Sequence, residues 1–252
     1  MPRWNEPALI LRRWDIAESD QLVTFLTPTK GKQKGIAKGA KRSRRRFGGL
    51  LLPFVLVSMQ CFEKDRQGLV RIENCDLIHY FYPLYEDLQK LLYGCYFLEL
   101  GETVLPEGGG SESVFQLLLT SFTALEGAAA REEMLRVFEV KILSYIGLQP
   151  AFASCVRCGR RLGSSGTFGF SMGEGGAVCG DCLPRVPVQH FVSAETLAFL
   201  HTLKQVPPCE AFQLDFPSKV LHECRKIIYP FLSYHLNKEL RAIKVLKGVR
   251  AT

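Results

Sequence analysis

The sequence lacks any long hydrophobic run. Its longest apolar candidate, residues 50–59, contains a proline, whereas a membrane-spanning helix needs about 20 apolar residues. The N-terminus carries Glu6, Arg12 and Arg13, which leaves no uninterrupted apolar core for a signal peptide. We therefore expect a cytosolic protein without a membrane partner. In that reducing setting, the nine cysteines favour free thiols or metal binding over disulfides.

Acidic residues are missing from a broad N-terminal region, because no Asp or Glu occurs between residues 21 and 62. Within this region, residues 30–46 read KGKQKGIAKGAKRSRRR and hold nine of the 32 Lys and Arg residues of the chain. The whole chain is +7 and this stretch is +9, which leaves −2 for everything else. The basic character is therefore one local feature, of the kind that faces an anionic partner.

Sequence motifs that mark common kinds of catalysis are also absent. The chain has no GxxxxGK[ST] for a nucleotide-binding P-loop, and no HExxH for a metallohydrolase. It has no H-x-E before a PCxxC, the pattern of zinc nucleobase deaminases. Nothing supplies a nucleophile beside a base. We expect a protein that is not an enzyme and has no small-molecule substrate.

The first 80 residues read as β-structure. Five short segments, most of them rich in β-branched and aromatic residues, are separated by Gly, Pro, Asp and Lys. These segments are ALILRRWDI, QLVTFLT, KGKQKGIAKGA, PFVLVSMQCF and GLVRIENCDLIHY. Five such strands suit a small barrel, of which the OB-fold is the best-known case. We predict an OB-fold β-barrel domain over residues 1–80.

Helical periodicity dominates the rest of the chain, which predicts an α+β fold class. The expected helices lie within residues 83–105, 111–127, 131–147, 193–206 and 218–246. In the first of them, Leu88, Cys95 and Leu98 are expected to share the buried face. Ser111 is expected to cap the second helix, and Pro230 to break the last one. Residues 81–150 and 188–252 are assigned to an α-helical C-terminal domain.

Two CxxC pairs interrupt the helical pattern, CVRC at 155–158 and CGDC at 179–182, with twenty residues between them. Two such turns at the ends of a hairpin offer four thiolates in the tetrahedral arrangement of structural Zn²⁺. We predict one structural zinc in a ribbon embedded at residues 151–187. The predicted ligands are Cys155, Cys158, Cys179 and Cys182. An Fe–S cluster on the same ligands, or a redox role for one pair, is the alternative.

The remaining five cysteines have no ligand spacing and are predicted to be small buried hydrophobes. They are Cys61, Cys75, Cys95, Cys209 and Cys224.

The basic stretch is predicted to contact the phosphates of nucleic acid, which would give sequence-independent binding that weakens with salt. Its first three lysines alternate and would lie on one face of a strand, whereas the later cations read as a flexible loop. The predicted DNA-binding residues are Lys30, Lys32, Lys34, Lys38, Lys41, Arg42, Arg44, Arg45 and Arg46. The alternatives are a solvated charge run, a nuclear localisation signal, membrane headgroups or an acidic protein partner.

The order of these features resembles the bacterial DNA repair and recombination protein family RecO. The most specific matches are AKGAK at 37–41, PF at 53–54 and LRVFE at 135–139, which leads into GLQP and the first CxxC. The resemblance covers nearly the whole chain. It implies an OB-fold, a helical bundle and an embedded zinc ribbon. It also implies binding and annealing of single- and double-stranded DNA, partnership with RecR, and contact with the single-strand-binding protein so that RecA is loaded onto coated DNA.

In that family, the acidic tail of the single-strand-binding protein docks on the helical domain near a basic pair. Arg136 matches the first basic position, while Val137 replaces the second. The resemblance therefore implies tail contact at Arg136, and an exposed helix arginine paired with Glu132 or Glu139 is the alternative. Together these features predict a non-catalytic recombination mediator in the cytoplasm, associated with the nucleoid. The alternative function is a zinc-ribbon RNA-binding or ribosome-associated factor.

Overall fold

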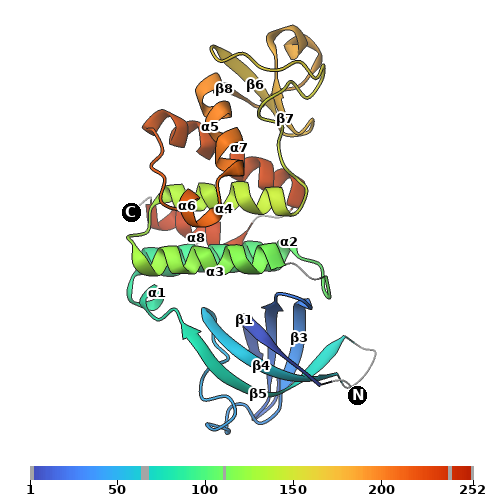
Figure 1. Cartoon of the computed structure of the whole chain (residues 1–252), viewed down its shortest axis with the longest axis vertical. Coiled ribbons are helices and arrows are strands. Elements are labelled where there is room, and N and C mark those ends of the chain that lie inside the picture. The colour runs from blue at the N-terminus through green and yellow to red at the C-terminus, as the bar shows by residue number, and fades with distance from the viewer. Residues whose placement is uncertain (1–2, 64–67, 110–111, 238–239, 251–252) are drawn as a thin grey trace. The chain divides into compact units, whose positions relative to one another are not determined.

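The computed structural model divides the chain into two compact units, drawn in Figure 1. The first unit is Met1–Ala129 with Lys244–Thr252, and the second is Ala130–Ile243. The structure describes all residues outside these ranges: 1–2, 64–67, 110–111, 238–239 and 251–252.

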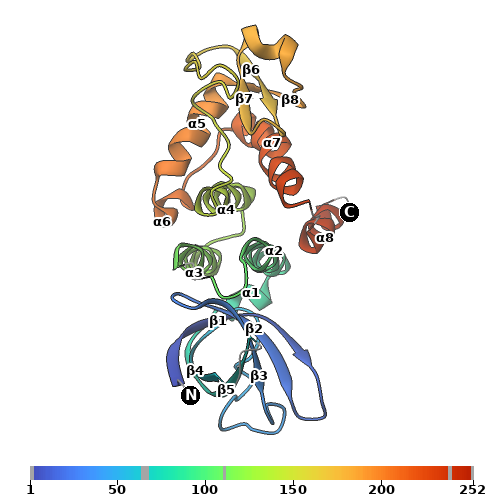
Figure 2. The same ribbon diagram turned by 90° about the vertical axis from the view of Figure 1, so that its right-hand side faces the viewer.

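The first unit begins with a five-stranded closed barrel, whose strands form a ring in the view of Figure 2. Its strands are β1 (Arg3–Asp15), β2 (Gln21–Thr27), β3 (Gly31–Ala37), β4 (Val55–Glu63) and β5 (Leu69–Tyr80). They are ordered β1-β2-β3-β5-β4, and β4 pairs back onto β1. Only the β3–β5 pair is parallel among these neighbours. All five predicted segments form strands.

The barrel interior is filled by alternate side chains of the strands, including Ile10, Phe25, Val57 and Ile72, none of which is exposed. Each such burial contributes about 1.5–3 kcal/mol relative to an exposed side chain. Phe47 joins this core with 1% exposure although it follows directly after the basic stretch. The core therefore anchors the segment that carries most of the positive charge.

Three helices follow the barrel: α1 (Pro83–Glu86), α2 (Leu88–Val104) and α3 (Glu112–Gly127). The side chain of Asp87 caps α2 by accepting hydrogen bonds from the backbone N–H groups of Gln89 and Lys90, at 2.8 and 2.9 Å. The predicted cap of α3, Ser111, lies outside the described residues.

The buried face of α2 differs from the prediction. Leu98 is buried as predicted, but Leu88 and Cys95 are exposed. Tyr93, Phe97 and Leu100, outside the predicted face, are fully buried. The helix is covered on two sides, so a single apolar stripe does not describe it. A β-carbon added at residue 94 would meet the ring of Phe54, and one added at residue 101 would meet Leu118 of α3.

Aromatic side chains join the barrel to these helices. The ring of Phe122 on α3 packs edge-to-face against the rings of Phe54 and Phe81, each with centroids 5.4 Å apart. The ring of Phe54 packs in the same way against Tyr85 of α1. The first compact unit therefore contains these helices together with the barrel, and the two units divide at residue 129.

The second unit is a group of helices into which a small sheet is inserted. Its helices are α4 (Glu132–Tyr145), α5 (Ala194–Gln205), α6 (Pro208–Ala211) and α7 (Ser218–Leu236). The insertion holds β6 (Thr167–Ser171), β7 (Gly176–Val178), the 3₁₀ helix η1 (Gly180–Arg185) and β8 (His190–Ser193). The sheet is antiparallel in the order β7-β6-β8. Every residue of α4 from position 134 to 143 is buried, which makes α4 the centre of this unit.

The predicted break at Pro230 is wrong, because α7 continues through it from Ser218 to Leu236. A proline inside a helix costs about 3 kcal/mol. Burial of Tyr229 and Phe231 on either side of the proline offsets that cost. The helix ends instead at Asn237, whose φ of 47° is left-handed. The last helix, α8 (Arg241–Arg250), crosses the division between the units.

Candidate metal centre and nucleic-acid interface

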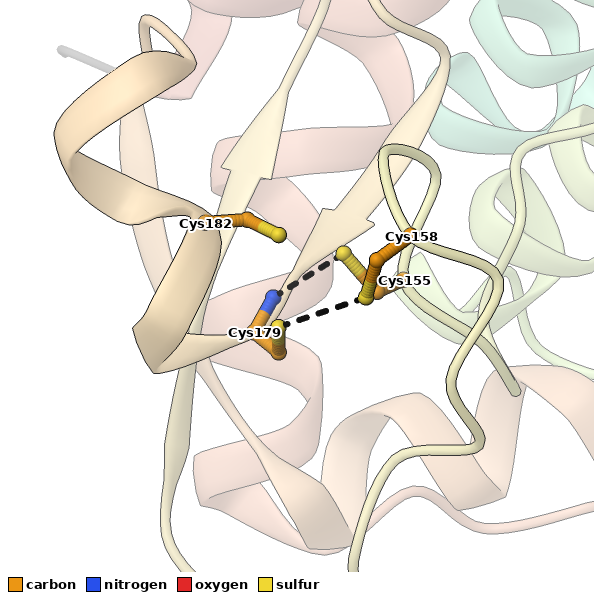
Figure 3. A group of neighbouring side chains, drawn as sticks. All are labelled: Cys155, Cys158, Cys179 and Cys182. Carbon is orange, nitrogen blue, oxygen red and sulfur yellow. Dashed lines mark hydrogen bonds between the residues drawn. The ribbon is translucent and has the colours of Figure 1, made fainter.

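The four predicted ligands converge in the second unit. The sulfur atoms of Cys155, Cys158, Cys179 and Cys182 all lie within 4.8 Å of one another. Figure 3 shows Cys155 and Cys158 on one loop, Cys179 just before η1 and Cys182 within η1, with the sulfurs pointing toward one another. The Cys158 and Cys179 sulfurs are 3.8 Å apart, which is the separation that about 2.3 Å Zn–S bonds give in a tetrahedron.

Local backbone turns bring each pair of sulfurs together. In the first turn, the N–H of Gly159 donates to the carbonyl of Cys155 at 2.9 Å, and Gly159 adopts a left-handed φ of 73°. In the second, the N–H of Cys182 donates to the carbonyl of Cys179 at 3.0 Å. The N–H of Val156 donates to Ala177 at 2.9 Å and holds the two turns side by side.

The surroundings of the Cys155 sulfur favour its thiolate form. Burial opposes its ionisation, but backbone N–H groups of Cys179, Cys158 and Arg157 outweigh that effect and lower its pKa to about 6. The first of these donors lies 3.4 Å from the sulfur. Burial, followed by hydrogen bonds with the neighbouring sulfurs, raises the pKa of Cys182 to about 12. Four thiols packed this closely favour a cation that lets all of them ionise.

The donor set therefore fits a metal ion held by four thiolates. The closed set leaves no open position for a substrate, which suits a structural ion. The surrounding apolar cluster is small, with Val178 and Val186 as its buried members besides two of the cysteines. A small core of this kind is typical of segments that a bound metal ion stabilises.

Three of the five other cysteines are buried as predicted: Cys61, Cys75 and Cys224. Cys95 and Cys209 are exposed, so the prediction is wrong for them.

The basic stretch lies in the first unit and splits into two parts. The strand lysines, Lys30, Lys32 and Lys34, lie on β3 or in the turn before it. The remaining cations form the segment after β3, residues 38–46, which we call the basic turn.

The strand lysines already have partners within the protein. The Lys30 ammonium lies 3.5 Å from Glu63 and over the ring of Trp4. Lys32 donates to the backbone carbonyl of Glu102 at 2.7 Å. Lys34 pairs with Glu107, and this contact holds the pKa of the Glu107 carboxyl below its usual value. A phosphate would have to compete with these contacts.

The basic turn has a defined shape, whereas the sequence predicted a flexible loop. The backbone N–H of Lys41 donates to the carbonyl of Ser19 at 3.1 Å, and that of Gly39 donates to Asp20 at 2.8 Å. Arg46 folds back, donating through Nη2 to the carbonyl of Lys38 at 2.8 Å. These bonds, together with burial of the adjacent phenylalanine, preorganise the turn.

Three cations of the basic turn are exposed and form no ion pair among the described residues: Lys38, Arg44 and Arg45. Lys38 is still close enough to Asp20 to act on it, since the N–H of Gly39, and to a smaller extent the charge of Lys38, hold the pKa of the Asp20 carboxyl below its usual value. Lys41 instead pairs with Asp15 at 2.8 Å, and Arg42 approaches Glu18 at 3.4 Å. The open cations therefore concentrate on the turn and not on the strand.

Arg136 occupies a place that sequence reasoning did not foresee. The residue is 4% exposed, and its Nη2 donates to the carboxylate of Glu139 at 2.8 Å. Both residues are on α4 and are buried. Cys224 of α7 lies close enough for both charges to act on its thiol. The pairing with Glu139 matches the alternative, but the exposed position that went with it is wrong, because the side chain is buried. The tail contact implied by the family stays a prediction.

Sequence reasoning missed Arg13, which lies on β1 and lines a pocket together with Lys41 and Arg44 of the basic turn. A signal was available. If the second and third predicted strands pair as a hairpin, Gln21 falls opposite Ala37, and the end of β1 comes beside the basic turn.

The fold and the two sites define a barrel protein that presents an exposed cationic turn and a four-thiol metal centre. Residues 1–81 match the family description "Recombination protein O N terminal", and residues 85–243 match "Recombination protein O C terminal". The chain therefore belongs to the recombination protein O (RecO) family, as its motifs indicated.

Similar proteins span the chain almost end to end. One from Anaeromyxobacter dehalogenans (strain 2CP-C), named "DNA repair protein RecO", is 35% identical and covers 99% of this chain and 98% of its own. Proteins of the same name from Myxococcus xanthus and Geobacter sulfurreducens are 32% and 30% identical. They cover 99% and 95% of this chain, and 99% and 96% of their own lengths. No helix of the described residues is long and apolar enough to span a bilayer.

Proposed function

We propose that this protein is a non-catalytic DNA-binding recombination mediator in DNA repair. The observation that carries the proposal is the preorganised basic turn, whose open cations Lys38, Arg44 and Arg45 stand on a barrel of a RecO-family chain. Phosphate contacts hold DNA without reading its bases, and a mediator that handles any sequence needs this kind of contact.

The barrel supports this role as an OB-fold. Its strand order, with β1 closing on β4 and β3 parallel to β5, is compatible with that five-stranded fold. OB-folds commonly bind single strands along a basic groove. The basic turn connects β3 to β4 at the rim of the barrel, where such a strand would pass.

The metal centre has a structural role in this proposal, as a zinc ribbon that holds one Zn²⁺ through Cys155, Cys158, Cys179 and Cys182. The ion would order an insertion between α4 and α5 that has little core of its own. It supplies no chemistry to a substrate, because four thiolates fill its coordination sphere.

The protein partners in the proposal are RecR and the C-terminal tail of the single-strand-binding protein. The protein would anneal complementary strands and, with RecR, help load RecA onto coated DNA. Family membership supports this set of partners, whereas nothing supports the RNA-binding or ribosome-associated alternative.

Strand annealing tests the function directly. We expect the purified protein to accelerate annealing of complementary DNA strands, both naked and coated with single-strand-binding protein. Coating with a variant of that protein that lacks its acidic tail should remove the acceleration on coated strands alone. Equal acceleration of RNA strands, or no acceleration of DNA, would contradict the proposal.

A further inference from the structure

A pocket of about 270 Å³ lies beside the basic turn, within the first unit. Its polar and aromatic walls come from the end of β1, the start of β2 and the basic turn itself. The residues that matter for its chemistry are Arg13, Gln21, Lys41, Ser43, Arg44 and Phe47. None of the strand lysines lines it.

The pocket concentrates positive charge. Three cations line it, namely Arg13, Lys41 and Arg44, and no acidic side chain does. Two acids lie beside this lining: Asp15 is 2.8 Å from Lys41 and accepts a 3.0 Å hydrogen bond from Gln21, and Asp20 accepts a 2.8 Å hydrogen bond from the N–H of Gly39. The three lining cations outnumber these two carboxylates, so the pocket keeps a net positive charge.

The walls are held in place before any ligand arrives. Phe47 is 1% exposed and belongs to the barrel core. The N–H of Lys41 is bonded to Ser19, and the N–H of Phe47 donates to the carbonyl of Ser43 at 3.3 Å. A preformed cationic pocket avoids much of the entropy loss that ordering a loop around a ligand would cost.

The size and charge limit what can occupy this pocket. Its volume is slightly below the roughly 300 Å³ at which pockets for drug-sized ligands begin, so it has room for about one nucleotide and not for a passing strand. An internal phosphodiester carries one negative charge. A terminal phosphomonoester carries about −1.5 to −2 near neutral pH, so a net positive pocket attracts it more strongly than it attracts a phosphodiester.

We propose that this pocket receives the terminal phosphate of a DNA strand, so that the protein distinguishes phosphorylated strand ends from the strand interior. The inference rests on the proposed function, since it takes DNA as the ligand. Arg13 and Arg44 supply guanidinium groups to the phosphate oxygens, and the basic turn holds the adjoining nucleotides.

Competition between short oligonucleotides tests this proposal. A fluorescent single strand bound to the full chain is displaced by oligonucleotides of about six nucleotides, near the lower end of OB-fold site sizes. They share one sequence and carry a 5′-phosphate, a 3′-phosphate or hydroxyl groups at both ends. We expect one phosphorylated end to compete about tenfold better, the effect of about one charge-assisted hydrogen bond.

Two double variants with the same change in charge locate the effect. Arg13→Gln with Arg44→Gln should abolish the preference for the phosphorylated end. Lys38→Gln with Arg45→Gln removes cations that do not line the pocket, so it should weaken all competitors alike and keep the preference. Ala40→Leu fills the pocket without changing its charge and should also abolish the preference.

The outcomes separate this inference from the proposed function. Equal competition by all three oligonucleotides, or a preference that survives both Arg13→Gln with Arg44→Gln and Ala40→Leu, overturns the pocket assignment and leaves DNA binding in place. If no oligonucleotide binds, a rise in melting temperature with dTMP but not with thymidine would support the phosphate pocket while contradicting the DNA-binding proposal. Absence of that stabilisation as well would overturn both proposals.

Discussion

The ring of Phe54 lies directly against the backbone of Gly94, where an added β-carbon would come within 2.8 Å of the ring atom Cε1. Phe54 itself has a φ of 60°, which is rare for a residue with a side chain. The same ring packs against Phe122 and Tyr85. One strained residue between barrel and helices thus fixes how α2 and α3 pack on the barrel within the first unit.

This relationship predicts that Gly94→Val destabilises the first unit by about 1–3 kcal/mol, because the ring has no free space to move into. Gly127→Val is the matched control, since nothing lies within 4 Å of a β-carbon there. Chemical denaturation of both variants gives the comparison. Equal stability of the two would mean that the ring moves aside easily.

Neutralising the open cations of the basic turn should reduce DNA affinity and its dependence on salt. For Lys38→Gln, Arg44→Gln and Arg45→Gln combined, the slope of log Kobs against log salt concentration on single strands should fall by about 2, since each phosphate contact contributes about 0.7. Anisotropy titrations at several salt concentrations measure this slope.

The strand lysines provide a control with the same change in charge. Lys30→Gln, Lys32→Gln and Lys34→Gln combined should change the slope less, because these side chains contact Glu63, Glu102 and Glu107 in the free protein. If the triple variant of the strand lysines changed the slope more than the triple variant of the basic turn, DNA would contact the strand face and not the turn.

Removing the metal should disorder the ribbon. With Cys155, Cys158, Cys179 and Cys182 all changed to serine, we expect no bound zinc by elemental analysis and rapid amide hydrogen exchange over residues 151–187. Changing the exposed Cys95 and Cys209 to serine should leave one zinc per chain. Slow exchange in the metal-free variant would show that the ribbon folds without an ion.

Gly176 is predicted to be irreplaceable in the ribbon. Its φ is 150°, and an added β-carbon would lie 2.5 Å from the carbonyl oxygen of Ala151. Since backbone atoms cannot move aside as a flexible side chain can, Gly176→Val should cost more than about 1–3 kcal/mol of backbone strain alone. Gly163→Val is the control, because a β-carbon there meets only one atom, at 3.9 Å. When a chelator is added, we expect the Gly163→Val protein to retain its zinc and the Gly176→Val protein to lose it.

Glu223 on α7 should make stability depend on pH. Burial opposes its ionisation, but hydrogen bonds from Thr196 and Ser193 outweigh that effect and hold its pKa below the ordinary 4.5. Its oxygen accepts bonds from the N–H and hydroxyl of Ser193, at 2.9 and 2.7 Å. Because the folded pKa is lowered, this stabilisation is present above pH 4.5 and is lost as pH falls through the folded value.

Glu223→Gln should therefore reduce stability by about 1–3 kcal/mol at neutral pH, the range for hydrogen bonds to a charged group. The difference from the natural protein should shrink as pH falls below the folded pKa, where Glu223 is protonated as well. Thermal melts at a series of pH values follow this convergence. A difference that stays constant with pH would exclude ionisation as its source.

The features predicted correctly from sequence are those set by local spacing. Two CxxC turns predict a ligand set without knowledge of the fold, and the sulfurs indeed converge. The five strands follow from residue composition and turn residues, and Ser193 was the expected start of a helix that α5 confirms. Spacing and turn chemistry act over a few residues, so one sequence contains them fully.

The features predicted wrongly depend on contacts between distant segments. Lys34 pairs with Glu107, 73 residues away, which an acid-free stretch around the lysine cannot indicate. Arg136 is buried because α4 is enclosed by its neighbours, although its helix position alone suggests a surface residue. Cys95 is exposed because other sides of α2 are covered: Gly94 faces Phe54 and Gly101 faces Leu118 of α3.

If DNA binds at the basic turn as we propose, the anchoring of this turn ties DNA binding to the folding of the barrel. The N–H of Cys75, inside the barrel, donates to the carbonyl of Arg46 at 3.0 Å, and Phe47 fills part of the core. An unfolded barrel therefore cannot present the cations in their bound arrangement. Bound DNA would then stabilise the folded barrel against unfolding, by about 2.7 kcal/mol when the free DNA concentration is a hundred times the dissociation constant. Strand release and barrel unfolding are in this way coupled equilibria.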